Sequence, residues 1–158
     1  MANTQSMCTS FMGELMTATH NFGVAPTRGT SAADTFNAAL YLVSATINAS
    51  TTVYTVTGEV SGTGYSAGGV AVTNATPPTA TNASATAGVA FFTPSASITY
   101  TTVTLATAFD TVLIYNSTQS NKAVSVHTFG SQTITAGTFT LTMPANTTTT
   151  ALLRLATT

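Results

Sequence analysis

The chain has 158 residues, a length that suits one domain with a substantial buried core. Charged residues make up only 4% of it, against a usual fraction of about 25%, and the net charge is −1. Three Lys and Arg residues are too few to neutralise nucleic-acid phosphates or to form a basic membrane-binding helix, and no apolar run approaches the roughly 18 residues of a membrane span, so both partners are excluded.

Residues 1–33 are predicted to form an N-terminal arm that carries a short helix. The beginning of this arm has neither the basic residues nor the apolar segment of a secretory signal, which predicts synthesis in a cytosol. Apolar residues spaced three and four apart over 10–20 favour an amphipathic helix with Ser10 as its N-cap. The single Cys8 cannot form an internal disulfide and is interpreted as a small buried hydrophobe.

Residues 34–158 are predicted to form one β-sandwich domain. β-Branched and aromatic residues alternate in short runs, with turn signals at spacings typical of antiparallel sandwiches. Residues 74–88, rich in Pro, Thr, Ala and Ser, are predicted to be an extended loop. The apolar spacing slips by one within 95–107, which predicts a β-bulge at Thr101 and Thr102. The strands expected outside the central hairpin lie at 35–44, 52–57, 69–73, 89–93, 95–107, 138–143 and 148–156.

The central hairpin of the domain is predicted at 109–130, which contains the densest apolar run of the chain and a polar turn. We expect Asn116 to lie opposite Lys122. That register places Thr111 opposite His127. Since both faces of this hairpin are partly apolar, it should be covered on both sides. The residues expected to be buried are Leu113, Ile114, Phe139, Leu141 and Leu153.

These patterns together predict an all-β fold. The expected architecture is an antiparallel β-sandwich of immunoglobulin-like or jelly-roll-like type, preceded by the N-terminal arm and its short helix. Helical periods do not alternate with the strands, so a parallel α/β fold is not expected.

Residues that could carry chemistry are few and scattered. Asp110, His127 and a serine could form a catalytic triad on paper, but no nucleophile-elbow motif is present, and His127 is interpreted as a member of a sheet face. A metal site needs a cluster of ligands, whereas Cys8 and His20 lie twelve residues apart with no further ligand near them. We therefore predict no catalytic, cofactor-binding or metal-ligating residues, no cofactor and no enzyme activity.

The glycine-rich segment 57–69 resembles a phosphate-binding loop only superficially, because it lacks the Walker lysine and no predicted helix follows it. Its glycines are expected to supply positive φ angles for tight turns and to allow close approach of the backbone to its neighbours. Glu59, one of very few charged residues, is expected to pair locally or to accept backbone N–H groups.

A series of short motifs runs through almost the whole chain. They are CTSF (8–11), EL (14–15), HNF (20–22), DTF (34–36), ALY (39–41), the 57–69 segment, IYNST (114–118), NKAV (121–124), FG (129–130), AGTF (136–139) and ALLRL (151–155). With these motifs the chain resembles a widespread family of small virion proteins of tailed bacteriophages. The 57–69 segment and the IYN…NKAV pair are the most specific parts. Where such families carry Lys after the first Phe, this chain has Met12.

The resemblance implies a non-enzymatic virion component, in the first place a capsid cement or decoration protein. Such a protein is made in the host cytoplasm, lies on the capsid surface and bridges subunits of the major capsid protein, here as an expected homotrimer. A tail-tube, head-fibre or tail-fibre component is the alternative. A carbohydrate-binding or hydrolytic domain is a third reading, against which the absence of Trp argues.

The composition agrees with a structural role. A free monomer usually carries more charge for colloidal stability, so the low charge predicts that much of the surface lies against other protein. A Thr-rich surface that is simply hydrated is the alternative interpretation.

Overall fold

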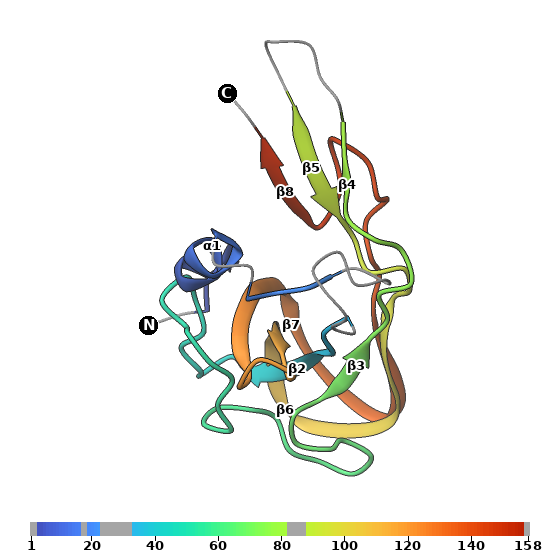
Figure 1. Cartoon of the computed structure of the whole chain (residues 1–158). Helices are drawn as coiled ribbons and strands as arrows, with labels where there is room; N and C mark the ends of the chain where they lie inside the picture. Colours follow the sequence, from blue (N-terminus) through green and yellow to red (C-terminus); the bar gives the residue numbers. More distant parts are fainter. Residues whose placement is uncertain (1–2, 17–18, 23–32, 82–87, 157–158) are drawn as a thin grey trace.

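The computed structural model describes residues 3–16, 19–22, 33–81 and 88–156. These residues form two antiparallel sheets and one short helix (Figure 1). The larger sheet has the strand order β1-β7-β6-β2-β3, and the smaller has the order β4-β5-β8. The all-β prediction is thereby confirmed. The elements are β1 Ser6–Met7, α1 Thr9–Met16, β2 Phe36–Leu42, β3 Val70–Val72, β4 Thr79–Ala80, β5 Val89–Phe92, β6 Ile98–Asn116, β7 Lys122–Leu141 and β8 Leu153–Ala156.

The predicted central hairpin is the inner half of a much longer one. The segments expected as separate strands at 95–107 and 138–143 continue it, so that β6 and β7 pair from the Asn116–Lys122 turn out to Leu141. The β6–β7 ladder changes register at five points. One change falls between Tyr100 and Val103, which confirms the predicted bulge.

This hairpin bends back over itself, as the yellow and orange strands of Figure 1 show. The rings of Phe129 and Phe139 lie ten residues apart on β7, yet their centroids are only 5.0 Å apart. A straight strand would separate them by about 33 Å. Positive φ angles at Thr102 and Ala136 accompany the irregular pairing. The fold-back lets the outer half of the hairpin cover the inner half, so the core lies inside the bend.

The core extends from the bent hairpin to β2 and the N-terminal residues. Tyr100, on the outer half of β6, donates a hydrogen bond from its hydroxyl to the carbonyl of Ala38 on β2 (2.7 Å). Cys8 and Phe11 are both buried in the same cluster, and β1 pairs with β7. The N-terminal residues that the structure describes are therefore part of the main sheet and its core. The division of the chain at residue 33 stays a prediction.

The predicted register of the hairpin is right at its end and wrong further along. Asn116 does lie opposite Lys122. Thr111, however, pairs with Thr128 instead of His127, because the ladder shifts by one residue between Ile114 and Tyr115. An irregularity of this kind inserts one extra residue on one strand and displaces all the pairs beyond it.

Burial follows the prediction in part. Leu113 and Ile114 are buried as expected. Phe139, Leu141 and Leu153 are only partly buried, packed against the edge of the core. All three lie on the outer half of the hairpin or in the smaller sheet, which have fewer covering layers.

The strand predicted at 52–57 is not formed. Val53 makes an isolated bridge to Lys122, and the segment otherwise crosses the end of the hairpin. Val53 and Val56 are 48% and 67% exposed, whereas Tyr54 packs against the core and stacks on Tyr115. A two-residue strand, β4, lies inside the segment 74–88 that was predicted to be a loop.

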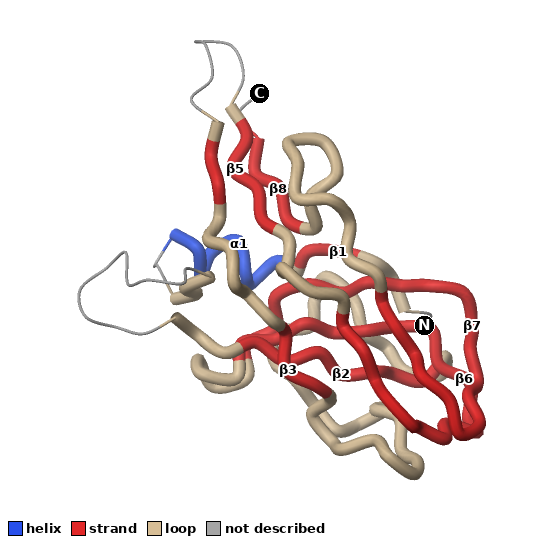
Figure 2. The backbone as a smooth tube through the Cα atoms, turned by 90° about the vertical axis from the view of Figure 1, so that its right-hand side faces the viewer, coloured by secondary structure: helices blue, strands red, loops and turns tan. Residues whose placement is uncertain are grey.

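The smaller sheet stands away from the larger one, as Figures 1 and 2 show. β4 and β8 are its two edges, and β4 is fully exposed. No helix in the described ranges is long and apolar enough to cross a membrane.

Candidate functional site

Three groups of hydrogen-bonded polar residues contain five of the charged side chains that the structure describes. The largest group links α1 to the end of the hairpin. Lys122 Nζ lies 2.5 Å from one carboxylate oxygen of Glu14, and His20 Nε2 lies 2.7 Å from the other. The other ring nitrogen of His20 faces the amide of Asn116 (3.0 Å), which also donates to Asp34 (2.7 Å). This network ties together segments more than eighty residues apart.

The hydrogen bonds around Asn116 fix the roles of the ring nitrogens of His20. The amide oxygen of Asn116 accepts two backbone N–H groups, from Thr118 and Gln119 (both 3.1 Å). Its amide nitrogen must therefore face His20 and Asp34 as a donor. It follows that His20 Nδ1 accepts and Nε2 carries the proton donated to Glu14. His20 is thus buried and bound on both sides, a structural role that leaves no nitrogen for a metal ion.

Glu59 is the centre of the second group. Its carboxylate accepts hydrogen bonds from the hydroxyls of Tyr54 (2.6 Å) and Tyr65 (2.7 Å) and from the backbone N–H of Gly68 (2.7 Å). The expectation that Glu59 accepts backbone N–H groups is confirmed. Burial first, and then the hydrogen-bonded Glu59 carboxylate, raise the pKa of both tyrosines well above its ordinary value. Both hydroxyls therefore remain donors.

Asp110 belongs to the third group and does not reach the histidine with which it could have formed a triad. Its carboxylate accepts hydrogen bonds from the side chains of Asn3 (2.7 Å) and Thr111 (2.8 Å). His127 instead lies 2.9 Å from the hydroxyl of Ser125, on the same strand. No interaction joins Asp110 to His127 in the part of the chain that the structure describes, so the triad is not assembled.

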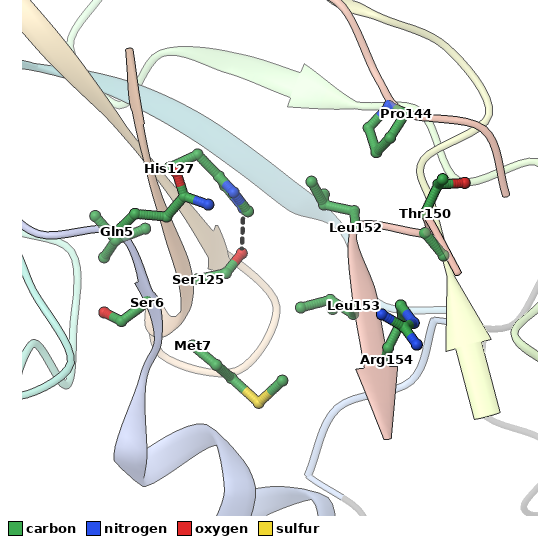
Figure 3. Close-up of a pocket in the computed structure, with 12 residues that line it drawn as sticks. Gln5, Ser6, Met7, Ser125, His127, Pro144, Thr150, Leu152, Leu153 and Arg154 are labelled. Atoms are coloured by element: carbon green, nitrogen blue, oxygen red, sulfur yellow. Dashed lines mark hydrogen bonds between the residues drawn. The ribbon is translucent and has the colours of Figure 1, made fainter. Parts of the chain in front are cut away.

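His127 and Ser125 line a cavity of about 480 Å³ (Figure 3). Its lining comes from β1, β7 and the C-terminal segment. Burial lowers the pKa of His127 to about 4, so its ring is neutral near pH 7. The lining residues are Gln5, Ser6, Met7, Ser125, Val126, His127, Pro144, Thr150, Ala151, Leu152, Leu153 and Arg154.

Two side chains that could act as nucleophiles, Ser125 and Cys8, are both buried. Ser125 is only 1% exposed, so its hydroxyl is not presented to a substrate. Cys8 is buried as predicted, and burial first, then the charge of Glu14, raise the pKa of its thiol to about 11. A thiol held in its protonated form is a poor nucleophile and a poor metal ligand. Among the described residues, no three His, Cys, Asp or Glu side chains gather to hold a metal ion.

Sequence reasoning did not find the cavity or the place of Arg154 beside it. Arg154 is exposed on β8, within the cavity lining. In the sequence, Arg154 follows Leu153 in a motif whose other residues predict a strand with an apolar face. The signal that could have found it is the scarcity of charge, since each charge in such a chain needs a specific reason.

A second, smaller hollow of about 120 Å³ lies between α1 and the smaller sheet and is almost wholly apolar. Leu155, which is 49% exposed, is one of its walls. The other lining residues are Met7, Phe11, Leu15, Phe22, Pro78, Ala90, Phe91, Phe92 and Leu153.

The Glu14 network makes stability depend on pH. Burial alone would raise the pKa of the Glu14 carboxyl, but hydrogen bonds from Lys122 and His20 and the positive charge of Lys122 hold it below its usual 4.5. A carboxylate whose folded pKa is depressed stabilises the fold above its unfolded pKa, and this contribution is lost as the pH falls through the folded value. We expect Glu14→Gln to lower the free energy of unfolding by about 1–3 kcal/mol near neutral pH.

The measurement is urea unfolding followed by circular dichroism, from neutral pH down to about pH 3.5. The difference between the wild type and Glu14→Gln should shrink below pH 4.5, the ordinary pKa of the group. His127 costs both proteins stability as the pH falls from 6.5 towards 4, so this effect cancels in the difference. A difference that stays constant across the acid range would show that Glu14 does not carry the pH dependence.

No protein-family model matches the chain, and neither the curated proteins nor the solved structures contain one that is significantly similar to it.

Proposed function

We propose that this protein is a non-enzymatic structural component of a bacteriophage virion, a cement or decoration protein on the capsid surface. In this role it bridges and stabilises neighbouring subunits of the major capsid protein, and it does so as a homotrimer. The same proposal assigns the two sheets to an immunoglobulin-like or jelly-roll-like sandwich. The resemblance of the chain to small virion proteins of tailed bacteriophages motivates it.

The observation that carries the proposal is the internal use of charge. Of the charged side chains that the structure describes, five are held by partners within the chain. They are Glu14, Asp34, Glu59, Asp110 and Lys122. Apart from Arg154 and the partly exposed Lys122, the described surface therefore carries mainly Thr, Ser and scattered apolar side chains. Such a surface favours permanent contact with other protein, where apolar burial and hydroxyl hydrogen bonds supply the affinity.

The smaller sheet supports the same reading. It projects from the larger sheet, although Leu153 packs against the core, and its two edge strands, β4 and β8, leave outward backbone groups that no strand in the described residues pairs. Natural proteins usually protect such edges with charge, proline or a covering element. Val43, Val53, Val56 and Leu155 are the exposed large hydrophobic residues. Assembly into a shell would cover both features.

The deciding experiment is imaging of purified particles, with the copy number of this protein measured on a stained gel. Hundreds of copies per particle, arranged over the capsid lattice, are expected of a cement protein. A few copies located on the tail or on fibres would replace the proposal with the tail-tube or fibre alternative. Absence from purified particles would overturn both.

Attachment to the particle is expected to survive high salt. Screening weakens exposed charge pairs, and the Debye length falls from about 10 Å at 0.1 M salt to about 3 Å at 1 M. Apolar burial is not screened. Particles washed with rising sodium chloride should therefore retain most of the protein, as measured by gel densitometry. Release of most of it over this range would show that charge dominates docking.

A deletion of residues 1–22 is a poor test of docking. It removes Cys8 and Phe11 from the core together with β1. The truncated chain would lose stability whether or not these residues touch the capsid, so point substitutions on the outer surface are needed.

A further inference from the structure

The cavity between β7 and the C-terminal segment is walled by two distant parts of the chain (Figure 3). On one side lie Gln5, just before β1, and His127 on β7, with the buried Ser125 beside it. On the other side, Thr150 and Arg154 come from the last residues before and within β8. At about 480 Å³ it is large enough to admit a side chain of another molecule.

Arg154 is the one positive charge of this cavity, and no described residue of the chain binds its side chain. Among the described charged side chains, it alone has no hydrogen bond or ion pair, and it is exposed. His127 adds no second charge, because its ring is neutral near pH 7. The remaining polar lining consists of hydroxyl and amide groups, which hydrogen-bond but carry no charge. The charge of the cavity is therefore complementary to that of a single carboxylate.

The chain cannot supply this carboxylate from a described residue of a second copy without breaking a network. Glu14, Asp34, Glu59 and Asp110 each accept at least two hydrogen bonds within their own chain. Freeing one of them would leave donors unpaired, at a substantial cost in free energy. The charge complementarity therefore points to a different protein.

We propose that the cavity receives an acidic side chain, Asp or Glu, of the protein on which this chain docks, with its carboxylate bound by the guanidinium of Arg154. A guanidinium binds a carboxylate through two parallel N–H groups, which fixes direction as well as affinity. The NH₂ group of Gln5 is the neutral donor that supplements this pair, since the hydroxyl of Thr150 already donates to the carbonyl of Ala145 (2.8 Å). The inference rests on the proposed function, in which apolar contact gives most of the affinity and this one ion pair gives the register.

The first test measures binding of purified protein to phage shells stripped of it. Arg154→Ala should bind about tenfold more weakly, Arg154→Lys should recover part of the loss, and Arg154→Glu should bind most weakly of all. Gln132→Glu is the matched control for Arg154→Ala, because it also makes the net charge more negative by one. It lies at an exposed position of β7 outside the cavity and should bind like the wild type. Removing Arg154 should also flatten the small salt dependence of binding, which a merely structural role would not do.

The second test uses the isolated protein and sodium acetate as the probe. Saturable NMR shifts at Ser125 and His127 that vanish in Arg154→Ala are expected. If the wild type does not bind shells, the proposed function fails, and the carboxylate site is then decided by acetate alone: absent shifts overturn it. If the wild type and Arg154→Ala bind shells equally well, the inference is overturned while the proposed function stands. Acetate shifts together with equal shell binding would mean that the cavity takes only a free anion, which also overturns it.

Discussion

We expect Gly69→Ala to lower the free energy of unfolding by at least about 3 kcal/mol, or to prevent folding. A Cβ atom placed on Gly69 would lie 1.6 Å from the carbonyl oxygen of Ala38 and 2.8 Å from the Cα of Ala39. Both neighbours are backbone atoms of β2, which is paired on both sides, by β3 and by β6, and cannot move away. The φ of Gly69 is also +74°, a backbone conformation that residues with a Cβ atom rarely adopt.

Gly130→Ala is the matched control for this prediction. Gly130 lies on β7, and nothing lies within 4 Å of a Cβ placed on it. The same chemical change is therefore expected to be neutral or slightly stabilising. Unfolding in urea can be followed by circular dichroism or tyrosine fluorescence, since the chain has no Trp. Equal stabilities of the two variants would refute the close approach of the 57–69 segment to β2.

Local sequence patterns predicted those features of the fold that depend on neighbouring residues. The turn that sets Asn116 opposite Lys122 is one, because turn residues and flanking apolar runs are close in sequence. The bulge after Tyr100 is another, since a slip in the period-two pattern is visible within a few residues. The close backbone approach of Gly69 was also predictable from composition, but not its partner strand.

The bend of the long hairpin was not predictable in this way. It depends on contacts such as that between Phe129 and Phe139, which share one strand and meet only after the strand has folded back. An alternating pattern records which face a residue occupies, not whether the strand is straight. For the same reason the outer halves of β6 and β7 were predicted as separate strands.

The candidate site was also beyond local patterns. His20 looked isolated in the sequence because its partners, Glu14 and Asn116, are brought together only by the packing of α1 against the hairpin. The cavity beside Arg154 likewise needs β1, β7 and the C-terminal segment in place. What the sequence did show is that charge is rare, and five of the charged side chains that the structure describes have partners within the chain.

The second large effect is expected at Glu59. We expect Glu59→Ala to lower the free energy of unfolding by about 3 kcal/mol, because it leaves the hydroxyls of Tyr54 and Tyr65 and the N–H of Gly68 without their acceptor. Tyr54 precedes the 57–69 segment, whereas Tyr65 and Gly68 lie in its second half. The carboxylate thus holds the segment against β2. The backbone of Glu59 also forms an isolated β-bridge with Tyr41.

Glu59→Gln separates the hydrogen bonds from the charge. The amide oxygen of Gln can still accept from Tyr65 and Gly68, and its NH₂ group can donate to the oxygen of Tyr54, so the loss should be only about 1 kcal/mol. Tyr54→Phe, which removes a single donor, should likewise cost about 1 kcal/mol. Urea unfolding of the three variants gives the comparison. A stability of Glu59→Ala equal to that of the wild type would show that the carboxylate is not the clamp of this segment. A loss in Glu59→Gln as large as that in Glu59→Ala would assign the stabilisation to the negative charge itself.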